Sequence, residues 1–317
     1  MGNPLAIARR ALCLLYRSWG KGFLGKIAVE FEKKETAKER VTGRPSSRVL
    51  ASGQGWVVAE MVCHAGPRDR VFEEQHSMAS VAIVTHGTFQ YRSSAGRELM
   101  TPGSLLLGNP GQCFECGHEH GTGDRCISFH FERGYFEELI AESGTESRNC
   151  FRALRVPPVR GTSGVIARAC ALRELESEDL SGQWEEIGVE LAARALEVAS
   201  DGKRRAWQSP AVEARVTRVV RIIENCPDQE HNLVALAREA KLSRYHFLRI
   251  FQQLTGVTPH QYILRARLRR AATRLMSERT QVLEIAMACG FGDVSNFNHA
   301  FRAEFGTSPR EYRKRTP

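Results

Sequence analysis

A stretch rich in Cys and His near the middle of the chain holds the residues best suited to chemistry. It reads "GQCFECGHEHGTGDRCISFHF" and runs from Gly111 to Phe131. Its Cys and His residues are Cys113, Cys116, His118, His120, Cys126 and His130. Thiolates and imidazoles are ligands that zinc and related transition metals prefer, and four of them can enclose one ion. The stretch therefore predicts a metal site or a group of functional thiols.

The geometry of an extended chain narrows the ligand set. Successive side chains of a strand point to opposite faces, so Cys113 and Cys116 would point apart if this segment is a strand. Cys116, His118 and His120 share a face only if the chain stays extended through Gly117. The predicted ligands are Cys116, His118, His120 and Cys126, or a subset of them, and the predicted cofactor is zinc or another transition metal.

Other interpretations of the same stretch stay open. One is a polar hairpin loop with buried structural thiols. Another is a thiol sensor, in which Cys116 or Cys126 reacts with an oxidant or electrophile because Arg125 and nearby histidines lower its pKa. Separately from this stretch, a small effector could bind inside the surrounding fold. The histidines that would line such a pocket are His64, His76 and His86.

The segments that must position these residues read as strands, followed by helices. Strand-like composition occurs at Gly55–Val62, Met78–Ser93, Gly103–Gly108 and Cys126–Glu132, with Gly and Pro turns between them. Short strands with frequent turns indicate a sandwich or small barrel, and "TPGSLLLGNPGQ" resembles the Pro-Gly turns of the cupin barrel. Residues 134–200 space their apolar positions by three and four, which predicts helices that pack on the barrel or form a dimer surface.

The last hundred residues predict two helix–turn–helix units. The first spans Asn232–Gly256 with Ser243 as the N-cap of its second helix, and the second spans Val282–Gly306 with Asp293 in that place. A helix over Pro259–Ser277 joins them, about 28 Å long at 1.5 Å per residue. Major grooves on one face of DNA recur about every 34 Å. One monomer can therefore place two recognition helices in successive grooves.

Basic residues are concentrated towards the two ends of the chain, whose formal net charge is +9. From Pro210 onward there are 18 Lys and Arg against 10 Asp and Glu, and residues 1–45 hold 10 against 4. Residues 46–209 are acidic on balance, with 17 against 22. The basic balance of the C-terminal region is typical of a protein that binds a polyanion.

From about residue 212 to 315 the chain resembles the DNA-binding domain of the AraC/XylS family of transcriptional regulators. The residues that match the signature of the family's second unit are Ile285, Ala286, Gly290, Phe291, Asp293, Ser295, Phe297, Phe301, Arg302, Gly306, Ser308, Pro309, Tyr312 and Arg313. Two positions depart from the family. His299 stands where Arg is usual, and Lys241 stands in the first turn where Gly is common, at a cost of about 1 kcal/mol if that backbone is left-handed.

The resemblance and the exposed helix positions together predict the DNA contacts. They are Arg244, Tyr245, Leu248, Arg249, Val294, Ser295, Asn296, Asn298 and His299. Arg249 suits guanine, Asn296 or Asn298 suits adenine, and the side chains of Tyr245 and Val294 suit thymine methyl groups.

The predicted fold class is α+β, in four segments. Residues 1–45 are an extension of uncertain order, 46–200 a cupin-like effector-binding and dimerisation domain with its helical part over 134–200, 201–210 a linker, and 211–317 the double helix–turn–helix domain. We expect a cytoplasmic homodimer with reduced thiols and no membrane span. Its expected partners are double-stranded DNA, a small effector and RNA polymerase.

The alternative class is an enzyme, either a metal cupin or a Cys-based DNA repair protein fused to a regulator. Cupin enzymes carry a His-x-His pair before the Pro-Gly strand, whereas His118 and His120 follow it. A nucleophile with an adjacent base is also not evident. The sequence therefore favours a regulator over an enzyme.

Overall fold

The computed structural model describes residues 45–71, 73–119, 121–142, 150–175, 180–199 and 209–314. The predicted extension over 1–45 and the predicted linker over 201–210 therefore lie almost wholly outside the described residues. We call the described residues 45–199 the N-terminal domain and 209–314 the C-terminal domain. Among the described helices, none combines the length and the apolar character that a membrane span requires.

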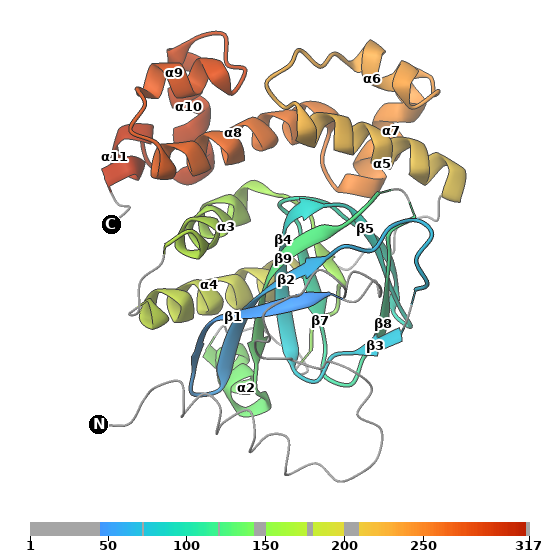
Figure 1. Ribbon diagram of the computed structural model, residues 1–317, viewed down its shortest axis with the longest axis vertical. Coiled ribbons are helices and arrows are strands. Elements are labelled where there is room, and N and C mark those ends of the chain that lie inside the picture. The colour runs from blue at the N-terminus through green and yellow to red at the C-terminus, as the bar shows by residue number, and fades with distance from the viewer. Residues whose placement is uncertain are drawn as a thin grey trace, which may run out of the picture. The chain divides into compact units, whose positions relative to one another are not determined.

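The N-terminal domain is built on two antiparallel sheets (Figure 1). The strands are β1 (Ser46–Gly53), β2 (Trp56–Cys63), β3 (Glu73–Gln75), β4 (Ala79–Gly87), β5 (Phe89–Ser93), β6 (Gly96–Met100), β7 (Leu105–Gly108), β8 (Cys113–Gly117), β9 (Asp124–Phe131) and β10 (Arg155–Val156). One sheet has the order β1-β2-β9-β4-β7-β10 and the other β3-β8-β5-β6. With the helical C-terminal domain, this confirms the α+β class.

The chain changes sheets within the segment that the sequence predicts as one strand, Met78–Ser93. The break comes at Gly87, whose φ of +78° lies in the left-handed region. A β-carbon at Gly87 would come 2.3 Å from the carbonyl oxygen of Gly123. A glycine is therefore needed here, and it lets β4 end in one sheet and β5 begin in the other.

Four strands have no counterpart among the predicted strand segments. β1, β3 and β6 lie in none of them, and β10 lies inside the region expected to be helical. β10 has two residues, with Arg155 opposite Leu106 and Val156 opposite Leu105 of β7. So short a strand has no periodicity of its own, and only its pairing with β7 defines it.

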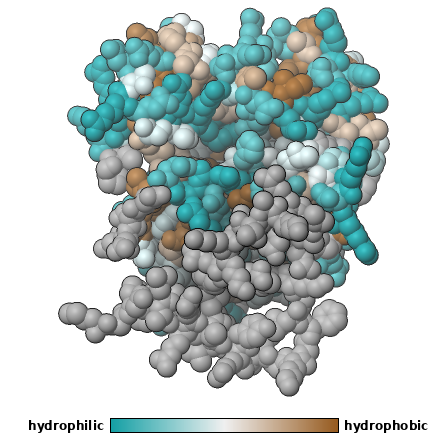
Figure 2. All heavy atoms as spheres, in the orientation of Figure 1, coloured by the Kyte–Doolittle hydropathy of each residue, from teal (hydrophilic) through white to brown (hydrophobic). Residues whose placement is uncertain are grey.

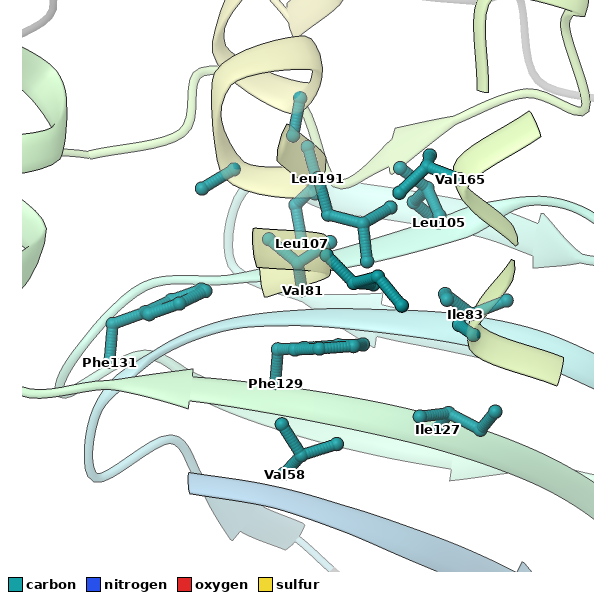
Figure 3. Close-up of a cluster of buried hydrophobic side chains, with 14 of the residues drawn as sticks. Val58, Val81, Ile83, Leu105, Leu107, Ile127, Phe129, Phe131, Val165 and Leu191 are labelled. Atoms are coloured by element: carbon teal, nitrogen blue, oxygen red, sulfur yellow. The ribbon is translucent and has the colours of Figure 1, made fainter. Parts of the chain in front are cut away.

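Helices cover one face of the six-stranded sheet. They are α2 (Arg133–Glu142), α3 (Arg160–Arg173) and α4 (Ser181–Ala199). Figure 3 shows Leu191 of α4 and Val165 of α3 among side chains from the strands, including Val81 and Phe129. Trp184 lies against Phe129, with 5.9 Å between ring centroids. The predicted packing of helices on the barrel is confirmed by this core.

A second apolar cluster fills the space between the two sheets. Ala82, Val84 and Leu106 come from the six-stranded sheet. Phe89, Tyr91 and Met100 come from the four-stranded sheet. Cys126 belongs to the same cluster, and Cys116 packs against it. These two thiols therefore lie in the interior of the sheet structure.

The C-terminal domain has seven described helices (Figure 1). They are α5 (Pro210–Asn225), α6 (Leu233–Glu239), α7 (Arg244–Thr255), α8 (Pro259–Ser277), α9 (Val282–Ala288), α10 (Val294–Phe305) and α11 (Pro309–Lys314). The predicted caps are present, since Ser243 accepts from His246 N and Asp293 accepts from Asn296 N. Thr258 forms a capping box with Gln261 at the start of α8.

Helix α8 contributes to two separate cores. Its first half adds Tyr262, Ile263 and Ala266 to the core of α5, α6 and α7. Its second half adds Leu268 and Leu275 to the core of α9, α10 and α11. Figure 1 shows α8 running between the two helix pairs. The prediction of two helix–turn–helix units on one connecting helix agrees with this arrangement.

Lys241 adopts a left-handed backbone in the turn between α6 and α7. Its φ is 51°, and it is the one non-glycine residue with positive φ among the described residues. A β-carbon in this conformation costs roughly 1–2 kcal/mol, part of which glycine would give back as extra freedom of the unfolded chain. The left-handed backbone at Lys241 therefore supports the expected loss of stability from replacing the family's glycine.

Replacing Lys241 with glycine should stabilise the protein. We expect Lys241→Gly to raise the free energy of unfolding by about 0.5–1 kcal/mol, because it relieves the left-handed strain. Urea denaturation followed by circular dichroism measures the change. Lys241→Ala is the matched control because it keeps the β-carbon. Equal stabilisation by alanine would show that backbone strain is not the cause.

Candidate nucleic-acid interface and Cys-His-Asp cluster

The first half of α7 presents its polar residues to solvent. Arg244 and Arg249 are exposed, the Tyr245 side chain is 78% exposed, and Leu248 is half-buried. Phe247 and Ile250, which are interspersed with or next to these residues in sequence, are fully buried in the core of the first unit. The helix therefore separates a buried face from an open face that carries all four predicted contacts.

Helix α10 repeats this division in the second unit. Ser295, Asn296, Asn298 and His299 are exposed, and Val294 is half-buried. Phe297 and Phe301 anchor the opposite face, with 5.4 Å between their ring centroids. Figure 2 shows a largely hydrophilic surface over the helices at the top of the view. The predicted contacts are therefore grouped on the open faces of two recognition helices.

The arginines of α8 are engaged within the protein. Arg269 pairs with Glu224 at 2.6 Å and Arg270 with Asp228 at 2.6 Å. Arg267 Nε donates to the carbonyl of Pro227 at 2.7 Å. The other two pairs are Arg265 with Glu304 at 3.2 Å and Arg274 with Glu278 at 2.8 Å. Four of these cations fix α8 to neighbouring segments, and Arg274 pairs with the C-cap residue of α8 itself. Their role is structural, which the basic composition alone did not reveal.

The predicted metal ligands are only partly brought together. His118 lies directly after β8, and its Nε2 is 2.5 Å from Asp124 Oδ2. Cys126 Sγ lies 3.5 Å from the other oxygen of Asp124. Cys116 packs in the cluster between the sheets, and His120 lies outside the described residues. The predicted set therefore shares one region but does not form a compact ligand group among the described residues.

Two residues that the sequence interpretation missed complete a compact group. Ligand atoms of Cys63, His118 and Asp124 all lie within 4.8 Å of one another. Cys63 ends β2, and strand pairing places it opposite Asp124, the first residue of β9. Cys63 lies 53 positions before Cys116, the nearest predicted ligand in the sequence. Only the register of β2 and β9, which the sequence does not display, could have indicated it.

Glycines let the backbone segments of this group approach closely. Gly123 has φ +72°, and a β-carbon there would lie 2.8 Å from the carbonyl oxygen of Cys63. Its amide donates to the carbonyl of Ala65 at 2.8 Å. The turn after β8 is thereby held against the end of β2, which brings His118 and Asp124 next to Cys63.

Burial controls the ionisation of the thiols. It raises the pKa of Cys116 and of Cys126 well above the ordinary range, and the negative charge of Asp124 acts in the same direction. The expectation that Arg125 and nearby histidines lower these pKa values is therefore wrong. Reactive thiols need a depressed pKa, so the structure disfavours Cys116 or Cys126 as the reactive group of a thiol sensor.

The histidines proposed to line an effector pocket lie in three different environments. His76 is 2.8 Å from the Tyr91 hydroxyl and stacks on Phe114, and burial lowers its pKa to about 4. His64 and His86 are exposed. His86 borders a cavity of about 60 Å³ whose other walls include Thr122 and, from α5, Arg221. The three histidines do not form one lining.

The N-terminal domain contacts both recognition helices. Arg155 Nη1 donates to the carbonyl of Leu254 at 2.7 Å, near the end of α7. Ser163 of α3 donates to the carboxylate of Glu304, near the end of α10. Arg97 of β6 pairs with Glu213 of α5 at 2.8 Å. The predicted DNA contacts lie in the first half of α7 and α10, so these interactions hold the opposite ends of the helices.

Comparison with protein families matches both domains. Residues 236–315 match the model of a helix-turn-helix domain, and residues 58–183 match the model of the AraC-like ligand binding domain. The chain belongs to the AraC/XylS family of transcriptional regulators. The family is one of DNA-binding regulators, so the prediction of a regulator rather than an enzyme is confirmed at the level of the family.

Curated relatives of this AraC/XylS-family chain align with about a third of it. The HTH-type transcriptional regulator MtrA of Neisseria gonorrhoeae is 29% identical over 118 residues, which cover 37% of this chain and 38% of MtrA. The HTH-type transcriptional activator RhaS of Escherichia coli O139:H28 is 37% identical over 101 residues, 32% of this chain and 36% of RhaS. These alignments span less than two-fifths of each relative's length.

Among solved structures, the DNA-binding domain of AdpA in complex with a target DNA is 31% identical. The match covers 32% of this chain and 90% of that domain, with a TM-score of 0.31.

The His118–Asp124 pair should make stability depend on pH. Burial lowers the pKa of His118, but hydrogen bonds to Asp124 and Cys63 outweigh it and raise the pKa to about 9. Because the folded value exceeds the unfolded value of about 6.5, the stabilisation is complete below pH 6.5 and is lost as pH rises towards 9. We expect the thermal midpoint in chelator to fall between pH 6.5 and pH 8.

The variant His118→Gln should flatten this dependence in the same pH range. His76 and His130 affect stability in a different pH range. Burial lowers their pKa values to about 4, so the stability that depends on their neutral form is lost as pH falls below 6.5. An unchanged slope above pH 6.5 in His118→Gln would contradict the assignment to His118.

Proposed function

We propose that this chain is a sequence-specific regulator that inserts α7 and α10 into successive major grooves of promoter DNA. The observation that carries the proposal is the grouping of exposed polar residues on the first halves of α7 and α10, at the two ends of α8. The residues proposed to contact DNA are those predicted from the sequence: Arg244, Tyr245, Leu248, Arg249, Val294, Ser295, Asn296, Asn298 and His299. Helix α8 is about 28 Å long at 1.5 Å per residue, which is compatible with the groove repeat.

Side-chain chemistry supports contacts of α7 with guanine and contacts of α10 with adenine. Arg249 can donate two hydrogen bonds to guanine O6 and N7, and Asn296 or Asn298 can form the corresponding pair with adenine. Arg244, exposed in the first turn of α7, can reach either a base or a phosphate. His299 stands where the family usually has Arg, so the second helix has one fewer permanent cation than a typical member.

The proposal includes a signal that enters through the N-terminal domain. The proposed signal is a small effector, a metal ion or a thiol-reactive compound. Contacts of Arg155 and Ser163 with the ends of α7 and α10 supply a physical route, because a shift of β10 would act on α7 and a shift of α3 would act on α10. A homodimer, contact with RNA polymerase and a cytoplasmic location are proposed on the basis of family membership.

The first test is the substitution Arg249→Ala. We expect specific affinity to fall by about 5- to 150-fold, the equivalent of the roughly 1–3 kcal/mol that a bidentate base contact provides. Preference at one base position should relax at the same time. Selection of binding sites from a random DNA library, followed by footprinting, measures both effects.

A matched control is Arg133→Ala, which removes an arginine that is 87% exposed on α2 of the N-terminal domain. It should leave affinity and preference unchanged. If Arg249→Ala also left both unchanged, the proposed register of α7 on DNA would be wrong.

The second test changes the spacing of the two half-sites. An insertion of about 5 bp between them turns the second half-site through roughly half a helical turn. Because α8 is one continuous helix with both units packed on it, we expect affinity to fall to that of a single half-site. An insertion of about 10 bp returns the second half-site to the same face of the DNA but leaves it too far from the first half-site. It should therefore not rescue binding. Recovery of binding with the longer insertion would instead indicate two independent or dimeric binding units.

A further inference from the structure

We propose that Cys63, His118 and Asp124 bind one divalent cation of the zinc class, and that this ion is a signal for the regulator. The inference deepens the proposed function, on which its regulatory part rests. The three side chains come from the end of β2, the turn after β8 and the start of β9. One thiol, one imidazole and one carboxylate form a donor set that suits zinc.

The geometry of the three residues fits a small tetrahedral ion. Their ligand atoms lie within 4.8 Å of one another. Two ligands of a tetrahedral zinc, at bond lengths of 2.0–2.3 Å, are roughly 3.3–3.8 Å apart. Small side-chain rotations that open the 2.5 Å hydrogen bond between His118 Nε2 and Asp124 Oδ2 would therefore place the three ligand atoms around one ion. The side chains of His118 and Asp124 are only 2% and 9% exposed, which would shield bound metal from solvent.

A fourth ligand is available from the same strand. Cys126 lies two residues after Asp124 on β9, so both side chains point to the same face. Its Sγ is 3.5 Å from Asp124 Oδ1. Cys126 is thus the nearest candidate for the remaining position of a tetrahedral site, and water is the alternative occupant.

The segment that carries two of the ligands also touches the C-terminal domain. Glu119, next to His118, pairs with Arg92 and lies 3.8 Å from Arg97. Arg97 in turn pairs with Glu213 of α5 at 2.8 Å, and both side chains are largely buried. At Gly121 an added β-carbon would lie 3.4 Å from the guanidinium of Arg221, also on α5.

A chain of charges therefore links the proposed metal site to the first helix of the DNA-binding domain. An ion that fixes His118 would also fix Glu119, and with it the position of Arg97 against Glu213. Because α5 packs in the same core as α7, a change at α5 would reach the first recognition helix. We infer that metal binding alters DNA affinity through this path.

Cobalt titration of the full-length protein tests the site without DNA. Protein kept reduced and stripped with chelator is titrated with Co²⁺, and then with Zn²⁺ as competitor. We expect one Co²⁺ per chain, a thiolate-to-cobalt charge-transfer band, tetrahedral d–d bands, and displacement by Zn²⁺. The absence of a thiolate–cobalt band in the reduced protein would overturn the proposal.

Variants identify the ligands. Cys63→Ser and Asp124→Asn should each weaken Co²⁺ binding at least about tenfold. The matched control is Cys113→Ser, which alters an exposed thiol of β8 and should leave binding unchanged. Circular dichroism checks that each variant is folded. Unchanged affinity and band intensity in both folded ligand variants would overturn the assignment of these residues.

Footprinting separates this inference from the proposed function. We expect the DNA dissociation constant of the metal-loaded protein to differ from that of the stripped protein by about fivefold or more, the usual lower range of allosteric coupling. Glu119→Gln should keep the Co²⁺ spectrum but reduce that difference. Specific DNA binding that is indifferent to metal would overturn the signalling role and leave the proposed DNA function intact. Metal binding by a protein that recognises no DNA sequence would contradict the proposed function and leave the site standing.

Discussion

The position of the first recognition helix, α7, relative to the sheets depends on the contacts of the buried Arg155 guanidinium. Its side chain is 1% exposed, and Nε lies 3.2 Å from a carboxylate oxygen of Glu98. It also donates to the carbonyls of Leu99 and Leu254, at 2.5 and 2.7 Å. A buried charge is costly unless it is paired and hydrogen-bonded, so these partners are tightly constrained. One cation thereby ties β6 and β10 to the end of α7.

A buried charged group also links the other recognition helix, α10, to its neighbours. Glu304 is largely buried and contacts two partners, Arg265 of α8 and Ser163 of α3. Since α8 also supplies side chains to both helix–turn–helix cores, each unit is positioned by the shared helix and by the N-terminal domain. The signal proposed to act on the sheet domain would therefore meet contacts that are already in place at the ends of α7 and α10.

Local chemistry explains which parts of the structure were predictable from the sequence. The caps Ser243 and Asp293 and the buried Phe247 and Phe297 act within a few residues, and the sequence predicts them directly. The association of Cys63 with Asp124 depends on the register of two strands that are distant in sequence. The burial of Cys126, which raises its pKa, depends on residues from both sheets, and no local pattern reports it. The DNA contacts themselves remain predictions, supported by exposure.

The pairing of the α8 arginines has a consequence for how this domain meets a polyanion. Arg265, Arg269, Arg270 and Arg274 each face a carboxylate of the protein. A cation already neutralised in this way displaces few condensed ions from a nucleic-acid backbone, and that displacement is what makes affinity depend on salt. The salt dependence of DNA binding should therefore reflect the free cations of the recognition surface rather than the 18 Lys and Arg of the region. Sequence charge overstates the electrostatic component of recognition in this chain.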